Sequence, residues 1–173
     1  MYQYLKMFKK YTKGIILAGG HGTRLYPLTK SMSKQLLPVN DKPMIYYPIS
    51  LAMISGIKEL LIITSPEFKQ DYKNLLLNGN QWGIDIEYVT QNNPNGIAEA
   101  LIMGEKFIGN NNIALFLGDN LFFGNDIFDM VRKDFDLSHN AVLYACAVKN
   151  PNRYGVIEFN DKNEVISIEE KPQ

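Results

Sequence analysis

The sequence has almost no cysteine, no excess of charge and no long apolar stretch. Its one cysteine, Cys146, rules out an internal disulfide framework, and its apolar setting at 141–148 predicts a buried, inert thiol rather than a nucleophile. The 18 basic and 18 acidic residues cancel, so the composition predicts no nucleic-acid partner. No apolar run approaches the roughly 20 residues that cross a bilayer. We therefore expect no membrane partner and a cytoplasmic location.

The first residues lack the pattern of a secretion signal. Lysines and aromatic residues alternate over 1–13, as the start of a signal peptide can, but glycines follow from Gly14 in place of an apolar segment and a cleavage site. A chain of 173 residues suits a single core. The sequence thus predicts an N-terminal extension at 1–12 and one domain at 13–173.

Short apolar runs alternate with segments of helical periodicity. Strands are predicted at 14–18, 60–64, 84–90, 113–117, 141–148, 155–159 and 165–169. Helices are predicted at 43–55, 67–77, 95–107 and 127–137. Because parallel strands need long crossover connections, this order predicts an α/β doubly wound fold, with a mostly parallel sheet between two layers of helices. The shorter connections of the last two strands predict an antiparallel edge or a small sheet excursion there.

A glycine-rich segment follows the first predicted strand. Ligands of doubly wound sheets bind outside the carboxyl ends of the strands, and this segment occupies such a place. Glycine lets backbone N–H groups turn toward a phosphate, and an arginine adds a fixed cationic fork. The sequence therefore predicts a polyphosphate site at Gly19, Gly20, Gly22, Thr23 and Arg24.

Other glycine motifs fit this segment less well. A P-loop ends in Gly-Lys-Ser or Gly-Lys-Thr, which the sequence does not contain. A dinucleotide fingerprint aligned on Gly20 and Gly22 needs a small residue where Leu25 stands, which disfavours hydride transfer. A plain left-handed turn stays open as an alternative. His21 is interpreted as an exposed loop residue, and an acid–base role is the alternative.

An acidic residue follows another apolar run. Asp119 comes after the predicted strand 113–117, with Gly118 between them. Its carboxylate is expected at the strand end, where a hard oxygen ligand suits Mg²⁺. The alternative is that Asp119 only caps a turn.

Several motifs together resemble the sugar-phosphate nucleotidylyltransferase family. The main ones are GGHGTRL at 19–25, SKQLLP at 33–38 and DKPMIYYP at 41–48, and the last two resemble the thymidylyltransferases within it. Further matches are QWG at 81–83, Gln91 with GIA at 96–98, LGDN at 117–120, RYGV at 153–156 and EEKP at 169–172. The match runs from about Lys13 to the last residue, and it implies a Rossmann-like nucleotidyltransferase fold.

The resemblance implies Mg²⁺-dependent transfer of a thymidylyl group from dTTP to α-D-glucose 1-phosphate, giving dTDP-glucose and pyrophosphate. The attacking phosphate is already a nucleophile, so a protein of this kind supplies positioning and cations. It also implies a step toward deoxysugars, such as the dTDP-rhamnose pathway of polysaccharide biosynthesis. Transfer from UTP stays open, because glutamine amides can hydrogen-bond either pyrimidine.

The resemblance also implies residue roles, although a lysine such as Lys34 or Lys171 is ordinarily just solvent-exposed. The implied catalytic residues are Arg24, Lys34, Asp119 and Lys171, with Asp119 as metal ligand. The implied nucleotide-binding residues are Leu17, Gly19, Gly20, Gly22, Thr23, Arg24, Gln35, Gln91 and Gly96. The implied sugar-phosphate-binding residues are Gly155, Glu170 and Lys171.

Members of this family continue beyond the segment that corresponds to Gln173. They add sugar-binding segments, a second metal-binding aspartate and a helical tail. The resemblance thus implies a domain truncated at its C-terminus, and a second hypothesis is a nucleotide-binding fragment without turnover. Full-length members form homo-oligomers, so self-association is also expected.

Overall fold

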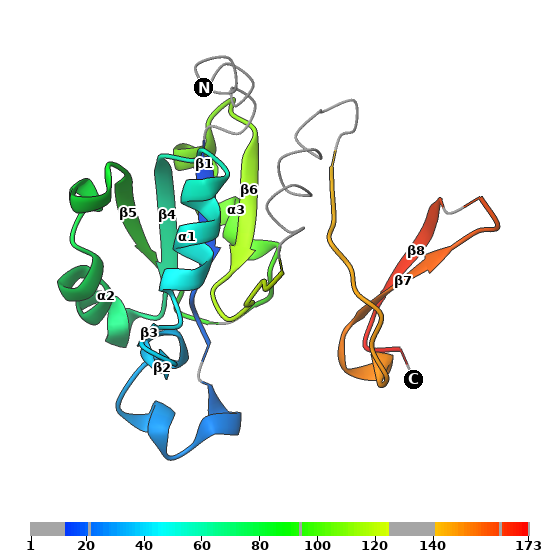
Figure 1. Cartoon of the computed structure of the whole chain (residues 1–173), viewed down its shortest axis with the longest axis horizontal. Helices are drawn as coiled ribbons and strands as arrows, with labels where there is room; N and C mark the ends of the chain where they lie inside the picture. Colours follow the sequence, from blue (N-terminus) through cyan, green and yellow to red (C-terminus); the bar gives the residue numbers. More distant parts are fainter. Residues whose placement is uncertain (1–12, 21, 94, 125–140, 163, 173) are drawn as a thin grey trace. The chain divides into compact units, whose positions relative to one another are not determined.

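A computed structural model describes residues 13–20, 22–93, 95–124, 141–162 and 164–172 (Figure 1). The chain divides into two compact units, Met1–Leu137 and Ser138–Gln173. We call the described part of the first the sheet unit and that of the second the hairpin unit. Within the described residues, no helix has both the length and the apolar character that a membrane crossing requires.

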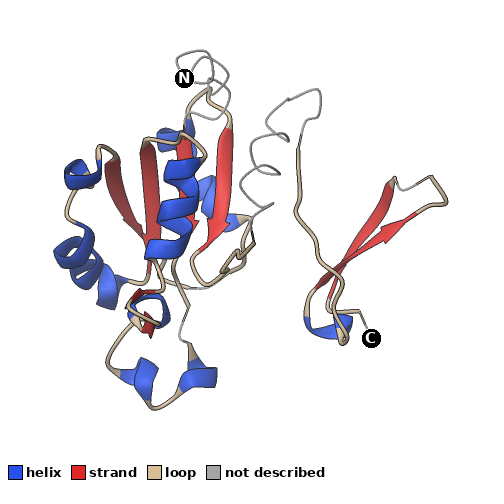
Figure 2. Cartoon of the chain, in the orientation of Figure 1, coloured by secondary structure: helices blue, strands red, loops and turns tan. Residues whose placement is uncertain are grey.

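The sheet unit is built on four parallel strands (Figure 2). They are β1 (Lys13–Leu17), β4 (Glu59–Thr64), β5 (Asp85–Thr90) and β6 (Ile113–Leu117), in the order β5-β4-β1-β6. Apolar runs form these strands because a parallel sheet is covered on both faces. The predicted parallel α/β sheet is confirmed.

Helices cover both faces of this sheet, as predicted. On one face lie α1 (Tyr46–Ile54), drawn in front of the strands in Figure 1, and α2 (Lys69–Leu76). On the other lie α3 (Glu99–Met103) and α4 (Glu105–Ile108). Neighbours along β1 divide between the two cores, because Ile16 packs with the first layer and Ile15 with the second.

The helices are shorter than the sequence predicts. The helix expected at 95–107 begins only at Glu99 and is divided at Gly104. A β-carbon on Gly104 would lie 2.8 Å from Ile15 Cδ1, so this position is adapted to close contact with β1. The helix predicted at 43–55 begins only at Tyr46. Pro43 instead belongs to a short ladder between β2 (Pro38–Val39) and β3 (Lys42–Pro43). The start of the helix predicted at 67–77 is a 3₁₀ turn, Pro66–Phe68. The predicted helix 127–137 lies outside the described residues.

The hairpin unit contains β7 (Gly155–Phe159) and β8 (Val165–Glu170), which pair in antiparallel fashion as expected. A 3₁₀ turn, Pro151–Arg153, precedes β7. The strand predicted at 141–148 is wrong, and so is the buried thiol, because Cys146 is exposed. An apolar run becomes a strand only when a neighbouring backbone completes its ladder, and no described strand does so for 141–148.

Candidate active site

The order of the strands creates a switch point between β1 and β6. From β1 the chain moves outward to β4 and β5, and it then returns to add β6 on the other side of β1. Strands β4 and β5 thus lie on one side of β1 and β6 lies on the other, and the crevice at the carboxyl ends of two such strands is where α/β sheets bind ligands. The glycine-rich segment follows β1 and Asp119 follows β6, so both predicted motifs come to this crevice.

The glycine-rich segment forms a tight loop with left-handed backbone. Gly22 has a φ of 57°, and a β-carbon there would lie 2.9 Å from Thr29 Cγ2. Thr29 is buried, and its hydroxyl donates a 2.7 Å hydrogen bond to the carbonyl of Gly22. The loop continues into the 3₁₀ turn Thr23–Leu25. Gly22 is therefore required both by its dihedral angles and by the space that Thr29 occupies.

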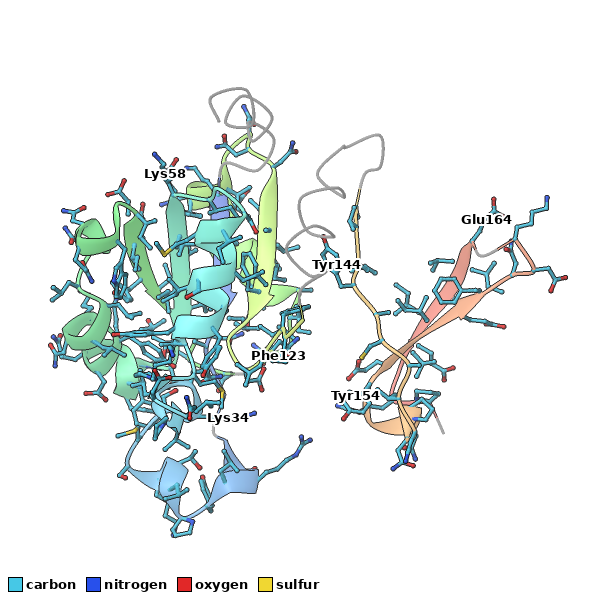
Figure 3. All side chains as sticks on the ribbon, in the orientation of Figure 1. Lys34, Lys58, Phe123, Tyr144, Tyr154 and Glu164 are labelled. Atoms are coloured by element: carbon cyan, nitrogen blue, oxygen red, sulfur yellow. The ribbon has the colours of Figure 1, made fainter. Side chains whose placement is uncertain are left out.

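A cavity of about 410 Å³ opens over this loop. Its lining residues are Gly19, Gly20, Gly22, Thr23, Arg24, Leu25, Lys34, Gln35 and Asp119. All of these except Leu25 are site residues that the sequence predicts. Figure 3 labels Lys34 at the end of the sheet toward which the strand arrows point, and Lys58 at the opposite end. The structure thus gathers the predicted triphosphate residues around one concave surface.

An ion pair joins two of these residues across the cavity. Lys34 Nζ lies 2.7 Å from Asp119 Oδ2, and the two side chains are 31% and 37% exposed. Such a partly exposed pair adds little to folding stability. The pair matters more for the chemistry of the site, because it places a predicted phosphate-binding lysine within contact of a predicted metal ligand.

Gly118 lies close to Leu17 and Gln35, and the sequence did not single it out as a site residue. Its N–H donates a 2.8 Å hydrogen bond to the carbonyl of Leu17. A β-carbon on Gly118 would lie 3.0 Å from that carbonyl oxygen and 3.1 Å from Gln35 Cγ. Its position between an apolar run and an aspartate is the signal that could have identified it. Leu17 itself ends β1 and does not line the cavity.

The side-chain amide of Gln35 contacts two buried hydroxyl groups, those of Ser33 and Tyr72. Its Oε1 accepts a 2.9 Å hydrogen bond from Ser33 and lies 3.3 Å from the hydroxyl of Tyr72. Those two hydroxyls are 2.7 Å apart. Burial raises the pKa of Tyr72, so its hydroxyl stays protonated. Ser33 and Tyr72 were missed, since nothing in the local sequence shows that a helix residue such as Tyr72 contacts the loop.

Two other predicted nucleotide-binding residues, Gln91 and Gly96, do not line the cavity. Gln91 follows β5 and is buried, and Gly19 lies next to its side-chain oxygen. Its Nε2 donates a hydrogen bond to Glu99, which was not predicted from the sequence as a site residue. Gly96 has a φ of 110°, which glycine adopts without strain.

The hairpin unit brings the predicted sugar-phosphate residues together. Gly155 pairs with Glu170 across the ladder, and a β-carbon on Gly155 would lie 3.4 Å from Glu170 Oε2. Lys171 has a φ of 49°, and its ammonium lies 3.2 Å from Glu170 Oε1. Its backbone N–H donates a 2.9 Å hydrogen bond to the carbonyl of Tyr154, which Figure 3 labels. Gly155, Glu170 and Lys171 are thus neighbours within this unit, and their part in sugar-phosphate binding stays a prediction.

The cavity offers part of a metal site. No three His, Cys, Asp or Glu side chains gather into a metal-binding group within the described ranges. Magnesium in nucleotide sites is held by one or two carboxylates, by phosphate oxygens and by water. The partly exposed carboxylate of Asp119 fits one such ligand position, next to cationic groups that suit phosphate.

A parallel sheet with a glycine-rich loop and a carboxylate at its switch point defines a nucleotide-binding α/β protein. A family model described as nucleotidyl transferase matches residues 13–173. The chain belongs to this nucleotidyl transferase family, and the resemblance noted in the sequence is confirmed.

Named relatives agree with this assignment. The chain is 54% identical over 161 residues to a glucose-1-phosphate thymidylyltransferase of Neisseria meningitidis, covering 93% of this chain and 56% of the relative. It is 49% identical to a protein of the same name from Xanthomonas campestris pv. campestris, covering 93% and 55%. The chain thus spans about half the length of the curated relatives it matches.

Two solved structures share the fold. A glucose-1-phosphate thymidylyltransferase from Bacillus anthracis, in complex with a sucrose, matches with a TM-score of 0.85 and 40% identity, over 93% of this chain and 65% of that one. A UDP-glucose pyrophosphorylase complexed with UDP-glucose matches with a TM-score of 0.75 and 28% identity, over 94% and 69%. The Rossmann-like nucleotidyltransferase fold is therefore confirmed.

Proposed function

We propose that this chain carries the nucleotide-activating part of a thymidylyl transfer from dTTP to α-D-glucose 1-phosphate. An oxygen of the sugar phosphate attacks the α-phosphorus of dTTP, and the bond from that phosphorus to the pyrophosphate oxygen breaks. The products are dTDP-glucose and pyrophosphate. The observation that carries the proposal is the single cavity in which Arg24, Lys34 and Asp119 meet the glycine-rich loop. The names of the curated relatives supply the substrates.

The cavity suits a triphosphate for three reasons. Its loop exposes backbone around Gly19, Gly20 and Gly22, which approach a phosphate closely because they carry no side chain. Arg24 and Lys34 supply positive charge from two different segments. Charges fixed in advance around a phosphate stabilise the transition state without further reorganisation. These residues act by holding the α-phosphorus in line between the attacking and leaving oxygens.

Asp119 is the residue we propose as a ligand of Mg²⁺. When bound, the ion neutralises negative charge on the phosphate oxygens. Asp119 holds its carboxylate at the carboxyl end of β6, and Lys34 pairs with one of its oxygens. Lys34 therefore restrains the carboxylate in the absence of ligand and is itself held close to the phosphate position.

We propose that the hairpin unit supplies the sugar-phosphate side. Lys171 contributes a cation for the phosphate, and Glu170 contributes carboxylate acceptors for sugar hydroxyls. Glu170 has free space beside it, because Gly155, which pairs with it across the ladder, carries no side chain. The ion pair between Lys171 and Glu170 keeps these two groups together in the absence of ligand.

The test is pyrophosphate release by the purified chain from dTTP, glucose 1-phosphate and Mg²⁺, with calorimetric dTTP binding on the same preparation. We expect Asp119→Asn to abolish turnover and to weaken Mg²⁺-dependent dTTP binding. Asp85→Asn is the matched control, because Asp85 is an exposed aspartate at the amino end of β5. Equal effects of the two variants would contradict the role of Asp119.

Two alternatives have a specific observation behind them. The likeness to a UDP-glucose pyrophosphorylase favours UTP as the competing substrate, so both triphosphates belong in the assay. The gathering of triphosphate-side residues around one cavity is also compatible with a nucleotide-binding protein without turnover, which would bind dTTP without releasing pyrophosphate. We also propose that the chain self-associates, and sedimentation over a range of concentrations tests this.

A further inference from the structure

The side-chain amide of Gln91 is held in one direction. Its Nε2 donates a hydrogen bond to Glu99 Oε2. Its Oε1 faces Gly19, where an added β-carbon would lie 3.0 Å from that oxygen. Gln91 is only 6% exposed, and its backbone N–H donates a 2.8 Å hydrogen bond to the carbonyl of Thr64. The position of Gln91 is therefore set by the sheet, and the direction of its amide is set by Glu99.

A carboxylate fixes an amide more strictly than another amide can. An ionised carboxylate only accepts hydrogen bonds, so a reversed Gln91 would place its own oxygen against an oxygen of Glu99. Glu99 is itself anchored, because Asn95 Nδ2 donates a 3.0 Å hydrogen bond to its other oxygen. The hydrogen bonds from Gln91 and Asn95 lower the pKa of Glu99, so the carboxylate is ionised at neutral pH.

The direction of this amide matters for reading a pyrimidine. A 4-oxo pyrimidine presents an acceptor at O4 beside a donor at N3, whereas a 4-amino pyrimidine presents a donor beside an acceptor. One fixed amide, with its N–H and its oxygen side by side, matches the first pattern. It meets the second with donor against donor and acceptor against acceptor. Reversing the amide would exchange these preferences.

We propose that Glu99 sets the selectivity of this site for 4-oxo over 4-amino pyrimidine nucleotides by holding the amide of Gln91 in one direction. The inference rests on the proposed function and on Gln91 as a predicted nucleotide-binding residue, whose amide lies next to Gly19 of the cavity lining and is taken to face the base. Glu99 is a positioning residue, since it acts through Gln91 and needs no contact with the nucleotide. Thymine and uracil share the same O4 and N3–H, so Glu99 does not distinguish dTTP from UTP.

The test compares calorimetric dissociation constants for dTTP and dCTP, with Mg²⁺, in the unmutated chain, in Glu99→Gln and in Asn95→Ala. We expect the unmutated chain to bind dTTP roughly 10- to 100-fold more tightly than dCTP. The Glu99→Gln variant keeps the shape of the side chain, but the introduced amide can either donate to Gln91 or accept from it. Both directions of the Gln91 amide therefore become populated. Binding of dTTP then weakens only about twofold, while the ratio between the two nucleotides falls to about threefold or less.

The control variant, Asn95→Ala, keeps the hydrogen bond from Gln91 to Glu99. Asn95→Ala removes the hydrogen bond to Oε1 of Glu99 and leaves Gln91 paired with Oε2, so we expect its dTTP-to-dCTP ratio to stay within about twofold of the unmutated value. A general disturbance of the loop would lower both affinities together and would leave the ratio unchanged in Glu99→Gln. That result overturns the inference, and so does an equal loss of selectivity in both variants.

A measurement on the unmutated chain makes the inference independent of how the variants fold. With ¹⁵N-labelled protein, the side-chain amide signals of Gln91 are assigned by their loss in Gln91→Met. We expect one of the two Nε2 protons to be shifted downfield by its charged acceptor. Absence of this shift overturns the inference. Binding of dTTP without preference over dCTP also overturns it, whereas failure of both pyrimidine triphosphates to bind contradicts the proposed function itself.

Discussion

The sheet unit and the hairpin unit differ in how they support their functional residues. In β4 every residue from Leu60 to Thr64 is buried, whereas every residue of β8 is exposed. The sheet unit therefore has a core on each face, while β7 and β8 form one layer held by their ladder. A single two-stranded hairpin is marginally stable in water. Burial fixes the candidate triphosphate site, but a ladder and a turn hold the candidate sugar-phosphate residues.

The two sites also differ in the range of their contacts. The pair between Lys34 and Asp119 joins positions 85 residues apart, so it exists only when the whole sheet is formed. In the hairpin unit, Glu170 pairs with the adjacent residue Lys171. We infer that damage to the sheet core disables the triphosphate site, whereas damage to the hairpin changes only its own residues.

The largest expected effect is on the free energy of unfolding, when the same isoleucine-to-alanine substitution is made in each unit. We expect Ile62→Ala in β4 to lower the free energy of unfolding by about 2–5 kcal/mol, because it leaves a cavity in a closed core. Ile168→Ala in β8, where the side chain is 57% exposed, should change it by less than about 0.5 kcal/mol. Urea denaturation followed by circular dichroism measures both. Similar losses from the two variants would remove the contrast between the units.

The next effect is on ligand binding. We expect Lys34→Ala to weaken calorimetric dTTP binding about 10- to 100-fold, since a charged hydrogen bond to phosphate is lost. Lys171→Ala is the matched change in the hairpin unit and should leave dTTP binding within about twofold. If Lys171→Ala weakened dTTP binding as much as Lys34→Ala, the division of labour between the units would be wrong.

A smaller effect is expected where glycines are replaced. Gly22→Ala forces a side chain into left-handed backbone and toward Thr29, and we expect it to cost about 1–2 kcal/mol of stability. Gly155→Ala would meet Glu170 at an ordinary contact distance, so its cost should stay below about 0.5 kcal/mol. Urea unfolding curves of the two variants measure the difference, and a larger cost at Gly155 would contradict it.

The smallest effect is a pH dependence that originates in the sheet unit. Burial raises the pKa of Tyr88 to about 12, from an ordinary value of 10.0, and its hydroxyl donates a 2.6 Å hydrogen bond to the carbonyl of Leu77. The folded state thus favours the protonated form, so this contribution is complete below pH 10 and is lost between pH 10 and 12. We expect the free energy of unfolding to fall less steeply over this range in Tyr88→Phe. Parallel slopes for the two proteins would show that Tyr88 does not contribute.

The sequence predicted the sheet better than its surroundings. Apolar runs such as 60–64 form strands because a covered parallel sheet requires them, and their local pattern is sufficient to find them. The apolar run 141–148 has a similar composition but no described ladder partner, and its strand prediction was wrong. The division of the predicted helix 95–107 at Gly104 was missed for a related reason, since the packing of Gly104 against Ile15 depends on a residue that is distant in sequence.

Candidate site residues were found where they belong to a motif. The glycine-rich loop and Asp119 are recognisable from their place after apolar runs, and the structure brings them to one cavity. The residues that orient Gln35 and Gln91 were missed, because Tyr72 contacts Gln35 from 37 positions away and Glu99 contacts Gln91 from the first residue of α3, 8 positions away. Hydroxyl or carboxylate partners of this kind have no local sequence signature.

The pairing of Lys34 with Asp119 has a thermodynamic consequence for the binding of two ligands at the cavity. The ammonium of Lys34 and the carboxylate of Asp119 neutralise each other. A phosphate that binds Lys34 therefore frees the carboxylate, and a cation that binds Asp119 frees the ammonium. On the proposed function, the two ligands therefore raise each other's affinity. Reciprocity requires the two factors to be equal, so the gain in triphosphate affinity from the cation measures the gain in cation affinity from the triphosphate.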